Sequence, residues 1–326
     1  MNKQIQLFLL IIITTNAQTV IDVDLYRIAE DIVDGPEAIA FDGEGKMYTA
    51  NEDGRIIVLP RDGTDPYDFA QTEGRPLGLK FDLQGNLIVA DAYEGLLSID
   101  TTGEIAILST ECDSLPFLLT DDLDISSDGI IYFSDASSVN NLENNGDDWG
   151  EPNGRLLAYD PQTNETSLLL DGLYFANGVA LSSDESFVLV NETLMYRIQK
   201  YWLKGDKAGT SEIFIENLPG FPDNVSSNEE GIFWVALFNP RNNYVEISSN
   251  KPFLRKIVLR LPELLQPQPV NHSFVLGLNE DGKVVHNLQY QANEAYSPIT
   301  SVKQYNDTLY FGSLTHPGWG KIEVPK

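Results

Sequence analysis

The chain has 326 residues and carries 49 acidic against 21 basic side chains, which gives a formal net charge of -28 at pH 7. This charge argues against a nucleic-acid-binding protein, because phosphates would be repelled instead of exchanging their counterions for basic side chains. A single cysteine, Cys112, excludes an internal disulfide, so packing must stabilise the fold, together with any ion that it binds.

Residues 1–17 have the pattern of a secretory signal peptide. A lysine near the start precedes an apolar stretch over residues 7–13, and small residues follow up to Ala17. We therefore expect cleavage after Ala17 and a secreted or periplasmic protein; a signal-anchored membrane form is the alternative. Residues 18–326 suffice for one large all-β domain or for two smaller domains.

A unit of two short strands around a turn recurs six times along the chain. Each copy alternates apolar and polar residues, turns at Asp, Gly, Asn or Ser, and continues with a second apolar strand. The copies are residues 37–51, 77–91, 121–135, 177–191, 223–237 and 300–314. Strands between the copies complete four-stranded sheets. The pattern predicts an all-β fold, a six-bladed β-propeller with four-stranded blades around a central metal-binding channel, formed by residues 18–326.

The first residue of each copy falls at an equivalent place around the predicted channel. Four of the six carry carboxylate or carboxamide oxygens; in order they are Glu37, Leu77, Asp121, Asn177, Asp223 and Thr300. Acids packed around a narrow channel repel one another, and a hard cation removes that repulsion. Oxygen ligands without His or Cys favour Ca²⁺ over zinc. We predict a Ca²⁺ site on Glu37, Asp121, Asn177 and Asp223, to which Asn224 adds an oxygen; the alternative is a water-filled channel lined by hydrogen-bonded polar groups.

A second polar set is expected on the same face, because the last residue of an antiparallel hairpin returns beside its first. We predict that this set, together with Thr300, lines a substrate pocket just outside the metal site; its members are Asn51, Asp91, Asp135 and Asn191. The alternative for these four residues is that they satisfy turns at the strand ends.

Two long segments interrupt the repeats. The acidic loop of residues 137–154 can serve as a docking surface, and its Trp149 would cover the pocket mouth. Residues 251–261 have apolar positions at helical spacing beside Arg255, Lys256 and Arg260, which predicts a short amphipathic helix. That helix packs on the propeller rim or, alternatively, acts as a lid or a peripheral membrane contact.

Three of the segments that carry a family resemblance are "DDLDISSDGIIYFSDAS", "FANGVALS" and "LPGFPDN". They resemble the strictosidine synthase-like family and its adipocyte plasma membrane-associated protein group, among the calcium-dependent six-bladed propellers such as gluconolactonases, paraoxonases and diisopropylfluorophosphatase. The resemblance is closest over residues 119–316. It implies a catalytic calcium held by Glu37, Asp121, Asn177 and Asp223, the same set that the repeat register gives. Asp121 departs from the Asn of most relatives, and Thr300 from the catalytic Glu of true strictosidine synthases.

The resemblance implies a hydrolase in which calcium polarises a substrate oxygen and Asp223 acts as base or nucleophile. An Asp beside a cation is a weak base at pH 7, so the expected substrates have strained rings or good leaving groups: lactones, aryl esters and activated phosphotriesters. Thr300 cannot do acid–base work at neutral pH, which argues against a true strictosidine synthase. The alternative is a non-catalytic, calcium-stabilised extracellular binding propeller. In either case we expect a monomer.

Overall fold

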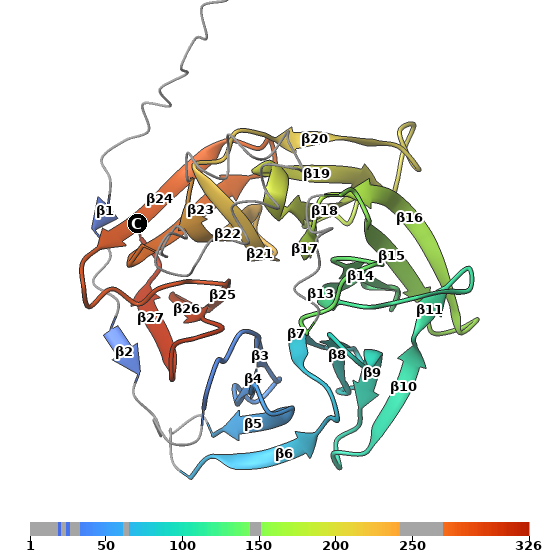
Figure 1. The fold of residues 1–326 in the computed structure, drawn as a ribbon, viewed down its shortest axis with the longest axis horizontal. Coiled ribbons are helices and arrows are strands. Elements are labelled where there is room, and N and C mark those ends of the chain that lie inside the picture. The colour runs from blue at the N-terminus through green and yellow to red at the C-terminus, as the bar shows by residue number, and fades with distance from the viewer. Residues whose placement is uncertain are drawn as a thin grey trace, which may run out of the picture.

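The structure is a computed structural model, and it describes residues 19–20, 24–26, 33–60, 65–143, 151–241 and 270–325. Within these ranges the chain is all-β apart from one short 3-10 helix, Thr193–Met195. Six main sheets surround a central axis, which confirms the predicted six-bladed β-propeller with four-stranded blades (Figure 1). The predicted signal peptide, the predicted helix at residues 251–261 and Trp149 lie outside the described residues.

The first three blades follow one another in chain order, each with its first strand nearest the axis (Figure 1). Blade one contains β3 (Ile39–Phe41), β4 (Met47–Ala50), β5 (Arg55–Leu59) and β6 (Tyr67–Gln71). Blade two contains β7 (Pro76–Phe81), β8 (Leu87–Asp91), β9 (Gly95–Ile99) and β10 (Ile105–Ser109). A small hairpin of β11 (Glu111–Cys112) and β12 (Leu115–Pro116) leads to blade three, which contains β13 (Thr120–Ile125), β14 (Ile131–Asp135), β15 (Gly154–Asp160) and β16 (Glu165–Leu173).

The last three blades repeat this order. Blade four contains β17 (Ala176–Leu181), β18 (Phe187–Glu192), β19 (Arg197–Trp202) and β20 (Ser211–Ile215). Blade five contains β21 (Gly220–Ser227), β22 (Ile232–Pro240), β23 (His272–Asn279) and β24 (Val284–Gln291), with β1 (Thr19–Val20) added in parallel to β24. Blade six contains β25 (Ser301–Tyr305), β26 (Thr308–Gly312), β27 (Trp319–Glu323) and β2 (Asp24–Tyr26).

Each of the six repeated sequence units forms the two innermost strands of one blade. The pairs β3–β4, β7–β8, β13–β14, β17–β18, β21–β22 and β25–β26 are all antiparallel. Consecutive inner strands also contact one another around the axis, from β3 through β25 and back to β3. The first positions of the six copies therefore do surround one channel.

Blade six is completed by a segment from the other end of the sequence. Strand β2 pairs antiparallel with β27, so residues 24–26 supply the outer strand of the last blade. Because a sheet closed by distant segments holds the ring together, this pairing joins the beginning and the end of the chain. The sequence did not reveal it, since three residues are too few to show strand periodicity.

The core consists of apolar side chains packed between neighbouring blades. Ile56, Ile57 and Val58 of β5 are all fully buried, because both faces of a blade are covered by its neighbours. A large cluster between blades four and five includes Leu189 and Phe233. Each fully buried Leu, Ile or Phe stabilises the fold by about 1.5–3 kcal/mol relative to exposure. The repeated packing keeps the inner strands in place around the channel.

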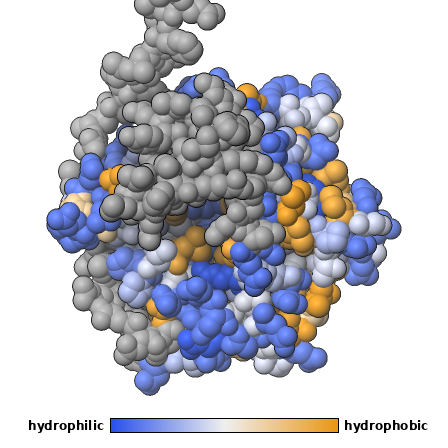
Figure 2. Space-filling view, viewed as in Figure 1, coloured by the Kyte–Doolittle hydropathy of each residue, from blue (hydrophilic) through white to orange (hydrophobic). Residues whose placement is uncertain are grey.

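Most of the face seen in Figure 2 is hydrophilic, as the net charge predicts. Apolar residues gather mainly at the right-hand edge of this view, where β10 and β16 lie. Ile107 in β10 is 60% exposed, and Leu168 in β16 is 40% exposed. Among the described residues, no helix has the length and apolar composition that crossing a membrane requires.

Candidate metal site in the central channel

The five predicted metal ligands lie at the beginnings of inner strands. Glu37 precedes β3, Asp121 is in β13, Asn177 in β17, and Asp223 and Asn224 in β21. All five are buried, with only 2% to 6% of each residue exposed. The structure therefore brings side chains from blades one, three, four and five to one end of the channel.

Hydrogen bonds join these side chains across blade boundaries. Asn177 Nδ2 donates to Asp223 Oδ1 at 2.8 Å, and Asn224 Nδ2 donates to Glu37 Oε1 at 3.4 Å. Asp121 has no such bond, but the negative charges of Glu37 and Asp223 act on its carboxyl group. The five side chains thus form one electrostatically coupled cluster.

One oxygen of each of four ligand candidates is buried without a hydrogen-bond partner. These atoms are Glu37 Oε2, Asp121 Oδ1, Asn177 Oδ1 and Asn224 Oδ1. A buried acceptor that makes no hydrogen bond is costly, and native structures contain few of them. Four such oxygens, one each from blades one, three, four and five, are gathered at one end of the channel, and a hard cation bound there would satisfy them.

Burial also disfavours the charged forms of the acids in this cluster. Burial raises the pKa of Glu37 to about 7, although the nearby Arg75 guanidinium opposes this rise. Burial, and then the negative charge of Glu37, raises the pKa values of Asp121 and Asp223 well above their ordinary range. A cation among them would favour ionisation again, because an opposite charge stabilises a carboxylate.

The donor set fits calcium better than a softer metal. Every candidate donor is a carboxylate or carboxamide oxygen, and Ca²⁺ takes six to eight such ligands, including water. Within the described ranges, no group of three or more His, Cys, Asp or Glu side chains is placed to hold a metal by itself. The proposed site therefore depends on the carboxamide oxygens of Asn177 and Asn224.

Bulges in the inner strands direct the ligand residues toward the axis. The pairing register shifts between Thr120 and Leu123 in β13 and between Ala176 and Val179 in β17, and similar shifts occur in β21 and β7. A β-bulge places an extra residue in one strand and re-aims its side chain. This explains how adjacent residues such as Asp223 and Asn224 both reach the cluster.

Two glycines allow the ligand-bearing strands to approach closely. A Cβ atom on Gly178 would lie 2.3 Å from the Val225 nitrogen, and one on Gly312 would lie 2.2 Å from the Glu37 carbonyl oxygen. Real Cβ contacts are never this short, so any side chain at these positions would push the strands apart. Residue Gly178 thus sets the distance between Asn177 and Asn224.

The predicted pocket residues at the hairpin ends are buried and engaged in local hydrogen bonds. Asn51 Oδ1 accepts from the Asp34 amide at 2.6 Å, and Asp91 Oδ1 accepts from three backbone amides. Asp135 forms an ion pair with Arg155 at 2.6 Å. These bonds are what strand-end turns require. Contact of these residues with a substrate stays a prediction.

Asn191 and Thr300, the other two predicted pocket residues, lie directly beside the metal ligands. Asn191 Nδ2 donates to the backbone carbonyl of Asp223 at 2.5 Å, which leaves its own Oδ1 buried and unpartnered. The Thr300 carbonyl accepts from the Asn224 amide at 3.0 Å, and its hydroxyl is buried without a partner. Both residues therefore support β21 at the point where it carries Asp223 and Asn224.

Arg75 belongs to the site and was missed by the sequence reasoning. Its side chain is buried, its Nη2 donates to the Gly35 carbonyl at 3.1 Å, and its Nη1 is buried without a partner. Its positive charge acts on Glu37. The residue lies just before the second repeat, outside the aligned copies, so the register gave no signal for it.

An apolar cluster accompanies the polar site. It contains Leu77, the first residue of the second copy, with partly buried Phe175 and Leu314 packed against it; the other buried members are Ala92, Leu119 and Ala136. Leu314 is the last residue of the sixth copy, so apolar residues from the first position of one copy and the last position of another meet in this cluster. Oxygen donors and an apolar wall therefore occur together at this end of the channel.

Each of the three histidines packs on an aromatic ring. His286 stacks on Trp234 at 5.0 Å between ring centroids, His272 on Phe274 at 5.1 Å, and the ring of His316 lies 4.6 Å from that of Tyr296.

Comparisons with known proteins point to one family. A family model described as strictosidine synthase matches residues 121–206, and one described as strictosidine synthase-like, N-terminal, matches residues 23–59. The chain is 37% identical to strictosidine synthase-like 3 of Arabidopsis thaliana, over 86% of this chain and 80% of that protein. It is 34% identical to adipocyte plasma membrane-associated protein of Bos taurus, over 89% and 76% of the two chains.

Solved structures of other propellers share the fold. A gluconolactonase from Xanthomonas campestris superposes with a TM-score of 0.65 at 16% identity, covering 90% of this chain and 87% of that chain. A calcium-binding protein, regucalcin, from Agrobacterium tumefaciens superposes with a TM-score of 0.62 at 15% identity and the same coverage. At these identities the likeness shows the fold alone.

Proposed function

The chain belongs to the strictosidine synthase-like family, as the sequence resemblance predicted, and from this premise we propose that it is a calcium-dependent hydrolase of lactones, aryl esters or activated phosphotriesters. The four buried oxygens without hydrogen-bond partners carry the proposal. They come from Glu37, Asp121, Asn177 and Asn224. Other atoms of these residues link the cluster: Asn177 bonds Asp223, Asn224 bonds Glu37, and the charges of Glu37 and Asp223 act on Asp121. Gluconolactonase and calcium-binding regucalcin among the structural neighbours are consistent with it.

Calcium at this site would supply a Lewis acid that polarises a carbonyl or phosphoryl oxygen of the substrate. The chain itself provides the charge balance. Glu37, Asp121 and Asp223 bring three negative charges, and a divalent cation together with the Arg75 guanidinium offsets them. The added charge of Asp121, where most relatives have Asn, would be offset by the cation, while Arg75 acts on Glu37.

Asp223 is the proposed base or nucleophile. Asn177 holds one of its carboxylate oxygens at 2.8 Å, and Asn191 holds its backbone carbonyl, so the side chain has a fixed orientation. A carboxylate stabilised by a neighbouring cation is a weak base, so the reaction requires a strained ring or a good leaving group. The apolar side chains of Leu77, Phe175 and Leu314 would exclude water from the rest of the substrate.

The second candidate is a non-catalytic, calcium-stabilised binding propeller, and Thr300 favours it. Its hydroxyl occupies the position of the catalytic Glu of true strictosidine synthases and cannot exchange a proton at neutral pH. If Asp223 does not act on a substrate, the other acids of the pocket are already engaged: Glu37 and Asp121 in the proposed metal site, Asp91 with backbone amides and Asp135 with Arg155. Export of the protein, and its monomeric state, are part of both proposals.

The test is hydrolysis of a panel of lactones and aryl esters by the purified protein, with calcium and after chelation. Asp223→Asn is the variant, and Asp128→Asn is a matched control at a carboxylate in the turn after β13, which belongs neither to the ligand cluster nor to the predicted pocket. Turnover that requires both calcium and Asp223 supports the hydrolase. No turnover on any substrate, with calcium still raising the melting temperature, favours the binding propeller.

A further inference from the structure

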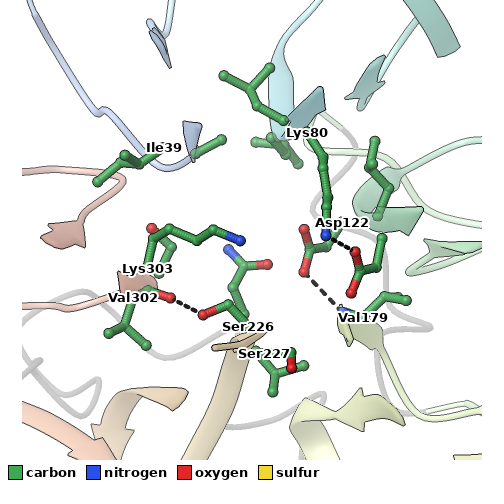
Figure 3. Close-up of a pocket in the computed structure, with 16 residues that line it drawn as sticks. Ile39, Lys80, Asp122, Val179, Ser226, Ser227, Val302 and Lys303 are labelled. Carbon is green, nitrogen blue, oxygen red and sulfur yellow. Dashed lines mark hydrogen bonds and ion pairs between the residues drawn. The ribbon is translucent and has the colours of Figure 1, made fainter. Parts of the chain in front are cut away.

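The channel has a second end, which the proposed hydrolase does not use. Lys80, Asp124 and Lys303 each stand at the fourth position of their repeat, three residues beyond the first. Since a strand rises about 3.3 Å per residue, these side chains enter the channel roughly 10 Å from the first position. We call this region the distal mouth. Figure 3 shows Lys80, Asp122 and Lys303 projecting into the cavity from three different strands.

Lys303 is the unusual group of the distal mouth. Among the described residues, its ammonium makes no hydrogen bond and no ion pair within 4 Å, whereas Lys80 pairs with Asp124. The nearby carboxylates are already engaged: Asp124 Oδ2 accepts from the Leu181 amide at 2.8 Å, and Asp122 Oδ2 from the Val179 amide at 2.9 Å. An amine is thus placed inside a protein channel without a partner of its own.

The surroundings of Lys303 lower its pKa. Burial lowers the pKa of Lys303, and the positive charge of Lys80 lowers it further. Three carboxylates face it and oppose this shift: Asp124, Glu229 and Asp122. The net direction is downward. A lysine that is desolvated beside a second cationic group is the arrangement that makes an amine nucleophilic near neutral pH.

The distal mouth is open to small molecules. Lys303 lines both the channel cavity of about 50 Å³ and a rim pocket of about 270 Å³. The rim pocket has aromatic walls: Phe41 stacks on Tyr305 with ring centroids 4.2 Å apart, and Phe81 also lines it. A planar apolar molecule with one reactive carbonyl fits such a pocket better than an anion does, because three carboxylates surround the amine.

We propose that Lys303 is a reactive amine that condenses with small aromatic aldehydes entering through the rim pocket. The Lys303 Nζ lone pair forms a bond to the carbonyl carbon, and the carbonyl oxygen takes up a proton, which gives a carbinolamine. The carbinolamine then loses its hydroxyl group and the remaining N–H proton as water, leaving an imine. No oxidant or reductant is needed. The amine lies toward the other end of the channel from the proposed calcium site, but the two regions meet: Asn224 also lines the channel cavity, and the charge of Asp122 acts on both Lys303 and Glu37.

The experiment is reductive trapping with benzaldehyde and cyanoborohydride at pH 7.5, followed by peptide mapping. The exposed lysines Lys204 and Lys283 serve as internal controls in the same sample. We expect Lys303 to be labelled faster than they are, because a lowered pKa leaves more of its amine neutral and nucleophilic at this pH. Lys303→Arg keeps the charge and should lose only this label, while its melting temperature reports on folding. Labelling of Lys303 no faster than Lys283 in the folded protein would overturn the proposal.

The pH dependence provides a second readout that accessibility alone would not change. The pH at which the labelling rate of Lys303 is half-maximal, the labelling midpoint, should lie below the corresponding pH for Lys283. Lys80→Met removes a positive charge and frees Asp124, and both changes favour the charged form of Lys303, so the midpoint should rise. If the midpoint equals that of the exposed lysines, or does not move in Lys80→Met, the amine is not activated and the proposal fails.

Discussion

Replacing Glu37 by Gln should stabilise the calcium-free protein and weaken the calcium-loaded one. Burial raises the pKa of Glu37 from 4.5 to about 7. The folded state therefore prefers the neutral acid, and its stability falls as the pH rises from the unfolded value of 4.5 through the folded value. The difference of 2.5 units corresponds to about 3 kcal/mol above pH 7, at 1.36 kcal/mol per unit.

Gln has the same shape without the charge, so this penalty should be absent from Glu37→Gln. Chemical denaturation of both proteins in chelator should give equal stabilities near pH 4.5 and a variant more stable by up to about 3 kcal/mol at pH 8. With calcium the order should reverse, because the variant has lost a carboxylate ligand. Equal stabilities at pH 8 in chelator would refute the argument that uncompensated charge is buried in this cluster.

Two further substitutions test how the site is built. Gly178→Ala should destabilise the protein by about 1–3 kcal/mol in chemical denaturation, since its Cβ would lie 2.3 Å from the Val225 nitrogen. Gly43→Ala, where nothing lies within 4 Å, is the control, and an equal effect of the two would contradict the close-packing argument. Arg155→Met should lower the free energy of unfolding by about 3–5 kcal/mol, because it leaves Asp135 charged and buried without its partner. A loss below about 1 kcal/mol would mean that the ion pair contributes as little to stability as a surface pair does.

The fold was predictable because the blade is a repeated local unit. Each copy has alternating residues and a turn, and six copies of equal length leave few other architectures. Closure by β2 was not predictable, since Asp24–Tyr26 pairs with a strand almost 300 residues away and shows no pattern of its own. Its partner, β27, becomes apparent only from the closed ring of blades, not from any local sequence pattern.

The same register located the ligand candidates but left out their neighbours. Glu37, Asp121, Asn177 and Asp223 share one column of the repeat, and the structure gathers them. Arg75 and Phe175 lie outside the six copies, in the segments that connect one blade to the next, so the repeat register does not predict their positions. Lys80, Asp124 and Lys303 do share a column, the fourth, and reading that column would have indicated the distal mouth. The bulges that turn adjacent residues toward the axis have no clear sequence signature.

The measurement that tests the central claim most directly is a calorimetric titration of calcium into chelator-treated protein. The account predicts one ion bound per chain, with affinity strongly reduced in Glu37→Gln and in Asp223→Asn and unchanged in Lys303→Arg at the distal mouth. Absence of binding, or binding that survives both ligand substitutions, would contradict the assignment of the calcium site to this end of the channel.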